Sequence, residues 1–185
     1  MVAQLFNDLN LPQENIMILT MLILRIVHIF AAIVWGGGAL LMSFFIGRGI
    51  QSTGNVGQQF AQYLTNTLRI HIFMSVAALA TIFAGAALYW IDSDGFTSPW
   101  MKSGPGIVFT IGAGFGLISF ITGAIFGNGN ARLGQIGAQV KDKPTPDQLA
   151  QIQAIQKRNK TVTPIHVVSM ILAMIFMASA RYFIF

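Results

Sequence analysis

The sequence predicts an all-α integral membrane protein that forms a four-helix bundle, with its N-terminus and C-terminus outside and short amphipathic helices on the cytoplasmic side. Its composition is the first observation behind this fold. Of the 185 residues, 54% are hydrophobic and only 9% are charged, and the mean hydropathy is +0.65. Soluble domains carry about 25% charged residues. The second observation is that the apolar residues gather in four runs, each long enough for a crossing of about 20 residues.

We predict one transmembrane domain over residues 1–185, with spans at about 22–47, 68–91, 105–127 and 162–184. The first apolar run, 16–47, is longer than one span requires. Counting back about 20 residues from Gly47 places Arg25 and His28 at the membrane boundary, where the arginine can snorkel into the headgroups. A span at 16–35 instead buries Arg25 centrally, at a cost of at least ~2.5 kcal/mol, so the first placement is preferred.

The two connectors, 48–67 and 128–161, hold most of the basic residues, which is the third observation. Arg48 lies in the first connector and Arg69 just beyond it, with no acid nearby. The second connector holds six basic residues against two acids: Arg132, Lys141, Lys143, Lys157, Arg158 and Lys160 against Asp142 and Asp147. The positive-inside rule then places both connectors in the cytoplasm of a multi-pass protein of the inner (plasma) membrane.

Both connectors contain local structural signals. Thr145, Pro146 and Gln148 have the pattern of a capping box that opens a short amphipathic helix. Apolar residues at helical spacing within 56–67 predict a second helix that runs straight into the second span. The glycine- and asparagine-rich stretch 127–137 and the stretch 141–146 are predicted to be linkers.

Small residues recur four apart in the spans, as in Gly112 with Gly116 and Gly123 with Gly127. Thr81 and Gly85 have the same spacing in the second span. Because small side chains let two helices approach closely, this pattern predicts helix packing within the bundle. The alternative is a face used for homo-oligomerisation or for a larger complex.

The chain has three histidines, and the predicted topology gives each a depth. His71 and His166 lie near the cytoplasmic ends of the second and fourth spans, at one level. Two imidazoles from different helices at one level, with cations such as Arg69 and Arg158 near the propionates, are what a b-type haem requires. The alternative is that these histidines anchor helices at the interface or hydrogen-bond a carbonyl of the next helix. For His28, the plain interpretation is a structural network with neighbouring charges.

Methionine offers a second metal hypothesis. Met170, Met174 and Met177 fall on one face of the fourth span, and thioether sulfur is a ligand that suits Cu(I). Methionine is also a common filler of apolar helix interfaces, so packing is the competing interpretation.

Several classes of function are disfavoured. The chain has no cysteine, which excludes disulfides and thiolate sites. All six acids lie outside the predicted hydrocarbon, whereas pumps and transporters usually place an ionisable group at mid-membrane. No residues combine a nucleophile, a base and an orienting acid, and no phosphate-binding glycine loop is present. The net charge of +5 is explained by topology, without a nucleic-acid partner.

The stretch RIVHIFAAIVWGGGALLMSFFIG, residues 25–47, resembles the first helix of the copper-resistance-protein-D-like membrane proteins and of related uncharacterised four-helix bacterial families. The shared residues are Arg25, His28, Trp35, Gly36 and Gly37. The stretch is distantly similar to the first helix of the membrane-bound protoporphyrinogen oxidase, a family considered to bind haem. This resemblance implies a four-span layout and nominates His28 as a functional ligand.

Taken together, the sequence predicts a small, non-enzymatic membrane subunit that bears a b-haem or acts as an accessory protein of an electron-transfer assembly. Its expected partners are the lipid bilayer and either further copies of itself or a larger membrane complex. Two alternatives remain: a copper- or metal-handling protein that uses His and Met, and a haem-linked redox enzyme.

Overall fold

The computed structural model describes residues 12–140 and 143–185, and within these ranges all regular structure is helical. Four helical segments there are long and apolar enough to cross a membrane: Gln13–Ser52, Ile70–Asp92, Gly104–Gln139 and Pro146–Tyr182. This confirms the all-α class and the four candidate spans of a multi-pass membrane protein. The orientation of the bundle in the membrane stays a prediction.

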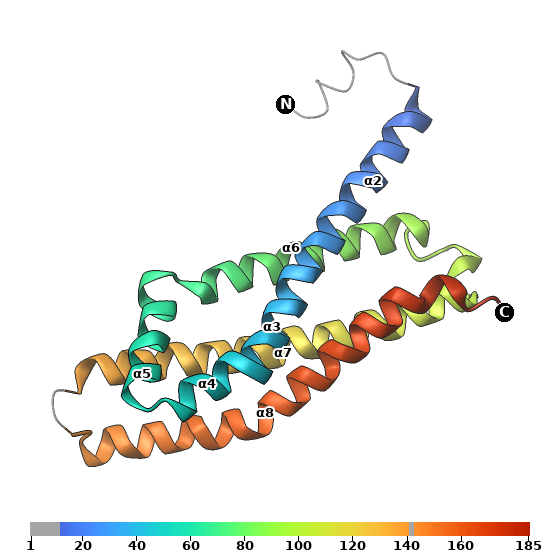
Figure 1. Cartoon of the computed structure of the whole chain (residues 1–185). Helices are drawn as coiled ribbons and strands as arrows, with labels where there is room; N and C mark the ends of the chain where they lie inside the picture. The colour runs from blue at the N-terminus through green and yellow to red at the C-terminus, as the bar shows by residue number, and fades with distance from the viewer. Residues whose placement is uncertain (1–11, 141–142) are drawn as a thin grey trace.

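The first long helix is continuous but not uniform. It consists of α2 (Gln13–Ala32), the π-helical turn η1 (Ile33–Gly37), α3 (Gly38–Leu41), a second π-helical turn η2 (Met42–Ile46) and α4 (Gly47–Ser52). In Figure 1, α2 slopes away from the other three long helices toward its N-terminal end. At 1.5 Å per residue the apolar run 16–46 is about 46 Å long, so an inclined path fits more of it into about 30 Å of hydrocarbon.

The other three long helices are α6 (Ile70–Asp92), α7 (Gly104–Gln139) and α8 (Pro146–Ser179). Helices α7 and α8 form an antiparallel hairpin packed along its length, and α2 packs on α6 (Figure 1). The short helices η4 (Pro99–Lys102) and η5 (Ala180–Tyr182) lie at one end of the bundle, where the Gly104 amide donates to the Phe185 carbonyl oxygen at 3.3 Å. We call this the terminal end, and we call the opposite end, with the segments 52–69, 139–140 and 143–146, the connector end.

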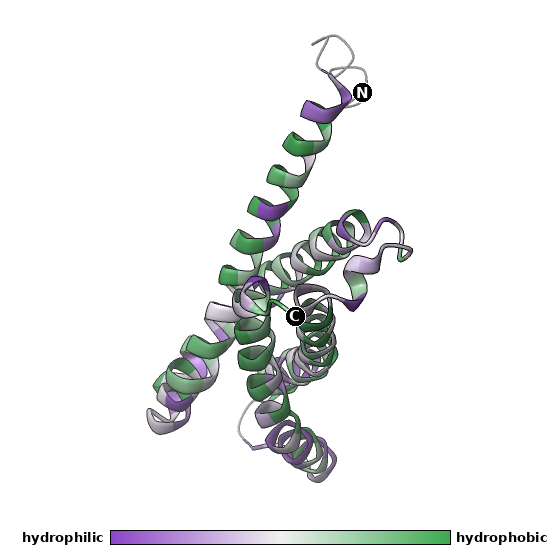
Figure 2. Cartoon of the chain, turned by 90° about the vertical axis from the view of Figure 1, so that its right-hand side faces the viewer, coloured by the Kyte–Doolittle hydropathy of each residue, from purple (hydrophilic) through white to green (hydrophobic). Residues whose placement is uncertain are grey.

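The bundle is held together at mid-length by a small apolar core. Trp35 and Ala39 of the first helix, Ala77 and Ala78 of α6, and Met170 of α8 form one buried cluster. The ring of Phe120 on α7 meets the Trp35 ring edge to face, with 6.3 Å between centroids. Figure 2 shows hydrophobic residues along the helices and hydrophilic ones toward the ends of α7 and α8.

Two expectations for the connectors are wrong. Residues 56–67 do not run straight into the second span: α5 (Asn55–Gln62) and the π-turn η3 (Tyr63–Thr67) end before Arg69, whose backbone is left-handed at φ 49°. The chain turns here because η3 packs on α7, where Leu64 is buried and the Thr65 methyl group approaches Gly134. The segment is therefore an elbow between α4 and α6.

The stretch 127–137 is not a linker, because α7 continues through it to Gln139. Glycine and asparagine have low helix propensity, but packing on α8 overrides it. Gly129 is buried against Arg158 and Asn159, and the Asn159 amide donates from Nδ2 to Oδ1 of Asn130 at 3.0 Å. A β-carbon at Gly129 would lie 2.8 Å from Asn159 Oδ1, so only glycine lets α8 approach this closely.

The capping box is confirmed. Thr145 Oγ1 accepts from the Gln148 amide at 3.2 Å, and the Gln148 side chain accepts from the Thr145 amide at 2.9 Å. The helix that begins here does not end before the predicted fourth span, since α8 is continuous to Ser179. The predicted short amphipathic helix is thus the first part of the fourth long helix.

Candidate functional site

His166 lies in the seam between α8 and α7 and is 6% exposed. Its Nδ1 lies 2.9 Å from the carbonyl oxygen of Ser119 on α7. The Ser119 hydroxyl lies 3.0 Å from the same nitrogen and donates to the His166 carbonyl oxygen at 3.3 Å. The ring rests on Gly123, where a β-carbon would lie 2.9 Å from its Cε1 atom. A hydroxyl residue and a glycine four positions later thus form the surface of α7 on which the imidazole packs.

His28 has the same arrangement on the other helix pair. Its Nδ1 lies 2.8 Å from the carbonyl oxygen of Thr81 on α6, and its ring rests on Gly85. A β-carbon at Gly85 would lie 2.7 Å from Cε1 of His28. The Thr81 hydroxyl donates to the Ala77 carbonyl oxygen at 2.8 Å. We call each such unit, a histidine with its hydroxyl residue and its glycine, a histidine clasp.

The hydrogen bond to a carbonyl oxygen in each clasp determines which ring nitrogen carries the proton. A carbonyl oxygen can only accept a hydrogen bond, so Nδ1 must carry the proton in both clasps. In a neutral imidazole, Nε2 then holds the lone pair and is the atom able to bind a metal or to accept a proton. Histidines that ligate metals are usually oriented in this way, by donating the other ring N–H to a backbone carbonyl. The same geometry also serves a purely structural purpose, since it joins two helices.

His71 is in a different environment. It lies in the first turn of α6, and its side chain is exposed. Arg69 is also exposed and occupies the N-cap position of α6 at the connector end. Arg158 is exposed on α8 and donates from Nη2 to the Ile125 carbonyl oxygen of α7 at 3.3 Å.

Three methionine side chains contact the glycines of the first helix and so show which parts of the helices lie at the same depth. The sulfur atoms of Met174 and Met170 lie 3.0 and 3.5 Å from the point where Gly36 would carry a β-carbon. The Met74 sulfur lies 3.0 Å from the corresponding point at Gly38. The structure thus brings two of the three predicted methionines to the glycines of the first helix, where they fill the space a side chain would take. Met177 lies elsewhere, against Gly112 of α7.

Counting residues from this level gives the depth of each histidine. At 1.5 Å per residue, His71 lies about 7–8 Å from the Gly36 level toward the connector end, and His166 lies about 9 Å in the same direction. His28 lies about 12 Å from it toward the terminal end. The contacts of His166 with Ser119 and Gly123, on either side of Phe120, bring its ring closer to the Trp35 level than this count does. His71 therefore lies about one helical turn from His166 in depth, and His28 lies about 20 Å from His71 along the bundle axis.

The other candidate groups form no obvious metal centre. Within residues 12–140 and 143–185, no group of three or more His, Cys, Asp or Glu side chains could hold a metal ion. Comparison of the chain with protein-family models, with curated proteins and with solved structures finds no match. The function of this chain is therefore inferred from its own geometry.

The alternative that a histidine near the connector end hydrogen-bonds a carbonyl of the next helix is confirmed for His166, but the pairing of each histidine with a hydroxyl residue and a glycine was not predicted. The spacings of Thr81 with Gly85 and of Ser119 with Gly123 are visible in the sequence. Small residues four apart predict close helix packing in general, and nothing in the pattern indicates that the incoming group is an imidazole. Two further glycines of α7 are not required for close packing, because a β-carbon at Gly116 or Gly127 would meet nothing within 4 Å.

Proposed function

We propose that this chain is a multi-pass inner-membrane subunit in which His71 of α6 and His166 of α8 would hold one b-type haem. The observation that carries the proposal is the clasp around His166. A buried imidazole whose Nδ1 proton is held by a carbonyl presents Nε2 as a ligand in a fixed direction. Iron ligation by two imidazoles needs both rings at a similar depth, and the depths of His71 and His166 differ by only about one helical turn.

The packing of the helices supports the same place. Helices α6 and α8 do not pack on each other extensively in the described structure, and η1 contacts both of them. His71 and His166 would hold the haem on the connector side of the core cluster that Ala77, Ala78 and Met170 share. Arg69 and Arg158 supply positive charge at the connector end, where propionates would reach out of the hydrocarbon.

The haem would supply one-electron redox chemistry in a dry site whose potential depends on ligand identity and burial. The chain itself would orient the His166 ring through Ser119 and exclude water with the core around Trp35. A subunit of this kind passes electrons within a larger assembly or a homo-oligomer. The connector end faces the cytoplasm in this proposal, as the positive-inside rule predicts.

The visible spectrum of the purified protein tests the assignment. Expressed with a haem precursor in the medium, the wild-type protein should show a Soret band and sharp α and β bands after reduction. His166→Ala and His71→Ala should each lose the low-spin spectrum, because each removes one axial ligand. His28→Ala is the matched control and should keep it, since His28 lies about 20 Å away along the bundle axis.

Three outcomes would contradict the proposal. A wild-type protein that stays colourless after expression with excess haem is not a haem protein. A spectrum lost in His28→Ala but kept in His71→Ala would move the ligand to the residue nominated by the resemblance of the first helix. A colourless protein with one bound copper ion, lost in Met170→Leu or Met174→Leu, would assign metal handling instead.

A further inference from the structure

The loop that joins α6 to η4 at the terminal end, residues 93–98, holds a bulky side chain in an unusual backbone conformation. Asp94, Gly95 and Phe96 have φ angles of 46°, 65° and 69°, so three consecutive residues are left-handed. Glycine adopts this conformation freely and aspartate tolerates it, whereas it is strained for phenylalanine. A strained residue persists only where its surroundings hold it, and such residues cluster at functional sites.

The surroundings of Phe96 are a set of hydrogen bonds around Ser93, which is fully buried. The Ser93 hydroxyl accepts from the Phe96 amide at 3.1 Å and donates to the Trp90 carbonyl oxygen at 3.3 Å. The Ser93 carbonyl oxygen accepts from the Thr97 and Ser98 amides at 3.0 and 2.9 Å. The loop is therefore held in shape by its own bonds.

This backbone presents Phe96 together with Trp90 of α6, and we call these two side chains the aromatic pair. Their rings meet edge to face with 5.1 Å between centroids, and each side chain is 56% exposed. The Tyr89 ring supports Phe96 from the α6 side at 5.9 Å between centroids. The described structure thus leaves more than half of both large apolar side chains uncovered.

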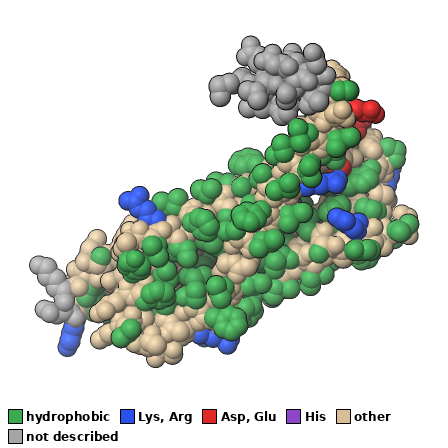
Figure 3. Space-filling model, turned by 45° about the horizontal axis from the view of Figure 1, so that its top comes forward, with side chains coloured by type: hydrophobic (Ala, Val, Ile, Leu, Met, Phe, Trp, Pro, Cys, Tyr) green, Lys and Arg blue, Asp and Glu red, His purple; other side chains and the backbone are tan. Residues whose placement is uncertain are grey.

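Trp90 lies on the face of α6 that is turned away from the bundle. Ile72, Val76, Leu79 and Phe83 follow one another at spacings of three or four residues and are 47%, 60%, 41% and 69% exposed. Trp90 comes seven residues after Phe83 and continues this row. Figure 3 shows hydrophobic side chains over the middle of one side of the molecule and charged ones toward its ends. In a multi-pass membrane protein, such a row faces lipid.

The aromatic pair lies at the depth where this row leaves the hydrocarbon. Helix α6 has 23 residues, about 34 Å, and is bracketed by Arg69 and Asp92, so it is only slightly longer than the ~30 Å of hydrocarbon. Trp90 lies two residues before Asp92, and Phe96 contacts it. Amphipathic aromatic rings are enriched at this boundary between acyl chains and headgroups.

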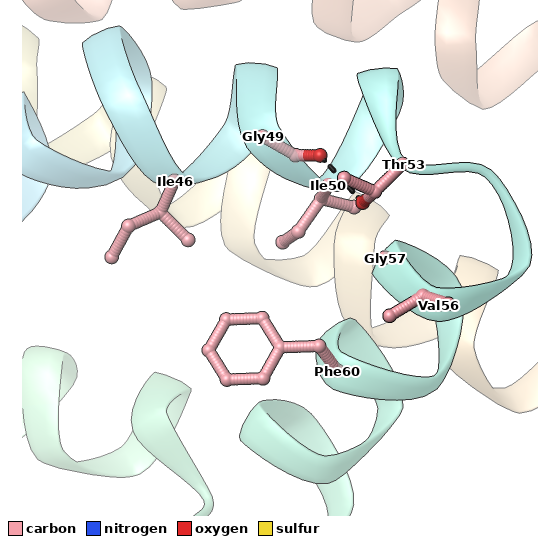
Figure 4. Close-up of a pocket in the computed structure, with 7 residues that line it drawn as sticks. All are labelled: Ile46, Gly49, Ile50, Thr53, Val56, Gly57 and Phe60. Atoms are coloured by element: carbon pink, nitrogen blue, oxygen red, sulfur yellow. Dashed lines mark hydrogen bonds between the residues drawn. The ribbon is translucent and has the colours of Figure 1, made fainter.

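An exposed phenylalanine at the connector end is held differently. Phe60 of α5 is 47% exposed and lies beside an open groove of about 270 Å³, with Ile46 and Ile50 on its other side (Figure 4). Its backbone is helical, so the amphipathic pattern of α5 accounts for its position. Phe96 lies on no helix, and its position depends on the strained loop.

We propose that the aromatic pair is a membrane anchor, which inserts into the boundary between acyl chains and headgroups at the terminal end and fixes the depth of α6 there. The partner is the lipid surface itself, because the pair continues the lipid-facing row of α6 and lies at the end of the span. Asp94, which is exposed on the same loop, remains in water. This proposal does not depend on haem, so a colourless protein would leave it standing.

Spin labels on single cysteines test the proposal in liposomes, because the chain has no cysteine of its own. Phe83→Cys, Phe96→Cys and Asp94→Cys report on the lipid-facing row, the pair and the polar side of the loop. Collisions with oxygen report lipid, and collisions with a water-soluble nickel chelate report water. The label at 83 should be deepest, the label at 96 at the boundary and the label at 94 in water. Equal access of the chelate to 94 and 96 would overturn the proposal. So would a label at 96 that neither reagent reaches, which would assign the pair to a protein partner.

A second experiment asks whether the Phe96 ring itself holds the loop at the boundary. A label on Thr97→Cys is combined with Phe96→Asn or with Asp94→Asn, and both changes put an asparagine at a left-handed position that this residue tolerates. Phe96→Asn should raise the access of the chelate to the label, because the loop loses its apolar contact with lipid. Asp94→Asn, the matched control, should leave it unchanged. Equal effects of the two changes, or no effect of Phe96→Asn, would show that the ring is not an anchor.

Discussion

Replacing Gly123 by alanine tests whether the imidazole of His166 is the reason for the glycine at this position of α7. The added methyl group would lie 2.9 Å from Cε1 and 3.1 Å from Nδ1 of His166. The first distance is about 0.6 Å shorter than the 3.5 Å at which carbon atoms pack favourably. Because the ring is buried and packs against Gly123, it must move away from α7 and lengthen the 2.9 Å bond to the Ser119 carbonyl oxygen.

Two contributions set the size of the effect. Overpacking of a well-packed interior costs about 1–3 kcal/mol. Loss of one interhelical hydrogen bond inside a membrane protein adds about 0.6–1.7 kcal/mol. We therefore expect Gly123→Ala to lower the free energy of unfolding by about 2–4 kcal/mol. Steric overlap contributes more of this loss than the hydrogen bond does, because interhelical hydrogen bonds add only modestly to the stability of membrane proteins.

Unfolding in mixed detergent–SDS micelles, followed by circular dichroism, measures this quantity. Gly127→Ala, on the same helix, is the matched control, because its methyl group would meet nothing within 4 Å. That variant should gain about 0.5–1 kcal/mol from the better helix propensity of alanine. The same chemical change, four residues apart, should thus have opposite signs.

A double-mutant cycle separates the ring from other causes. In a His166→Ala background the space at Gly123 is free, so Gly123→Ala should become neutral or stabilising, with a coupling energy of at least about 1 kcal/mol. If Gly123→Ala destabilised the protein equally with and without the imidazole, the clasp would not be the reason for the glycine. Equal stability of Gly123→Ala and Gly127→Ala would refute the reasoning outright.

The remaining predictions concern the other clasp, the cap of α8 and the topology. Gly85→Ala should destabilise the protein by a similar amount in the same unfolding assay, because its methyl group would lie 2.7 Å from the His28 ring; no loss would show that α2 is held on α6 by other contacts. Thr145→Ala removes the capping box and should lower the free energy of unfolding by about 1 kcal/mol, whereas Thr145→Ser should not. Since the chain has no cysteine, single-cysteine variants report topology cleanly: an impermeant maleimide should label Asp94→Cys in intact cells, and Lys157→Cys only after permeabilisation. The reverse labelling would invert the proposed orientation.

The spans were predictable because they depend on a strong average property. An apolar run of about 20 residues is long enough to cross a bilayer, and this property does not depend on which other segments it packs against. The Thr145 cap was equally predictable, since all its partners lie within four residues along the chain. A structural feature whose interacting residues are close together in the sequence can therefore be predicted without knowing the fold.

The continuation of α7 through Gly129 and Asn130 was not predictable, because its cause is distant in sequence. Both residues favour loops by themselves. They are helical here because α8 presents Asn159 to them, about 30 residues later, and glycine is the residue small enough for that approach. For the same reason the sequence pointed to His71 with His166 by depth, and could not show that one ring is exposed while the other is buried.

The two clasps explain why the bundle divides into two pairs of helices. His28 joins α2 to α6 near the terminal end, and His166 joins α8 to α7 nearer the connector end. Neither clasp joins α6 to α8, and the first helix contacts α8 mainly at η1, where Gly36 admits two methionine sulfurs. In lipid there is no hydrophobic force to press the pairs together, so their separation is set by what fills the seam. Between α6 and α8 the seam is filled at mid-length by Trp35 and Met170. A haem on His71 and His166 would therefore add a second link between these two helices on the connector side of that core, and stabilisation of the bundle by haem should disappear when either ligand is removed.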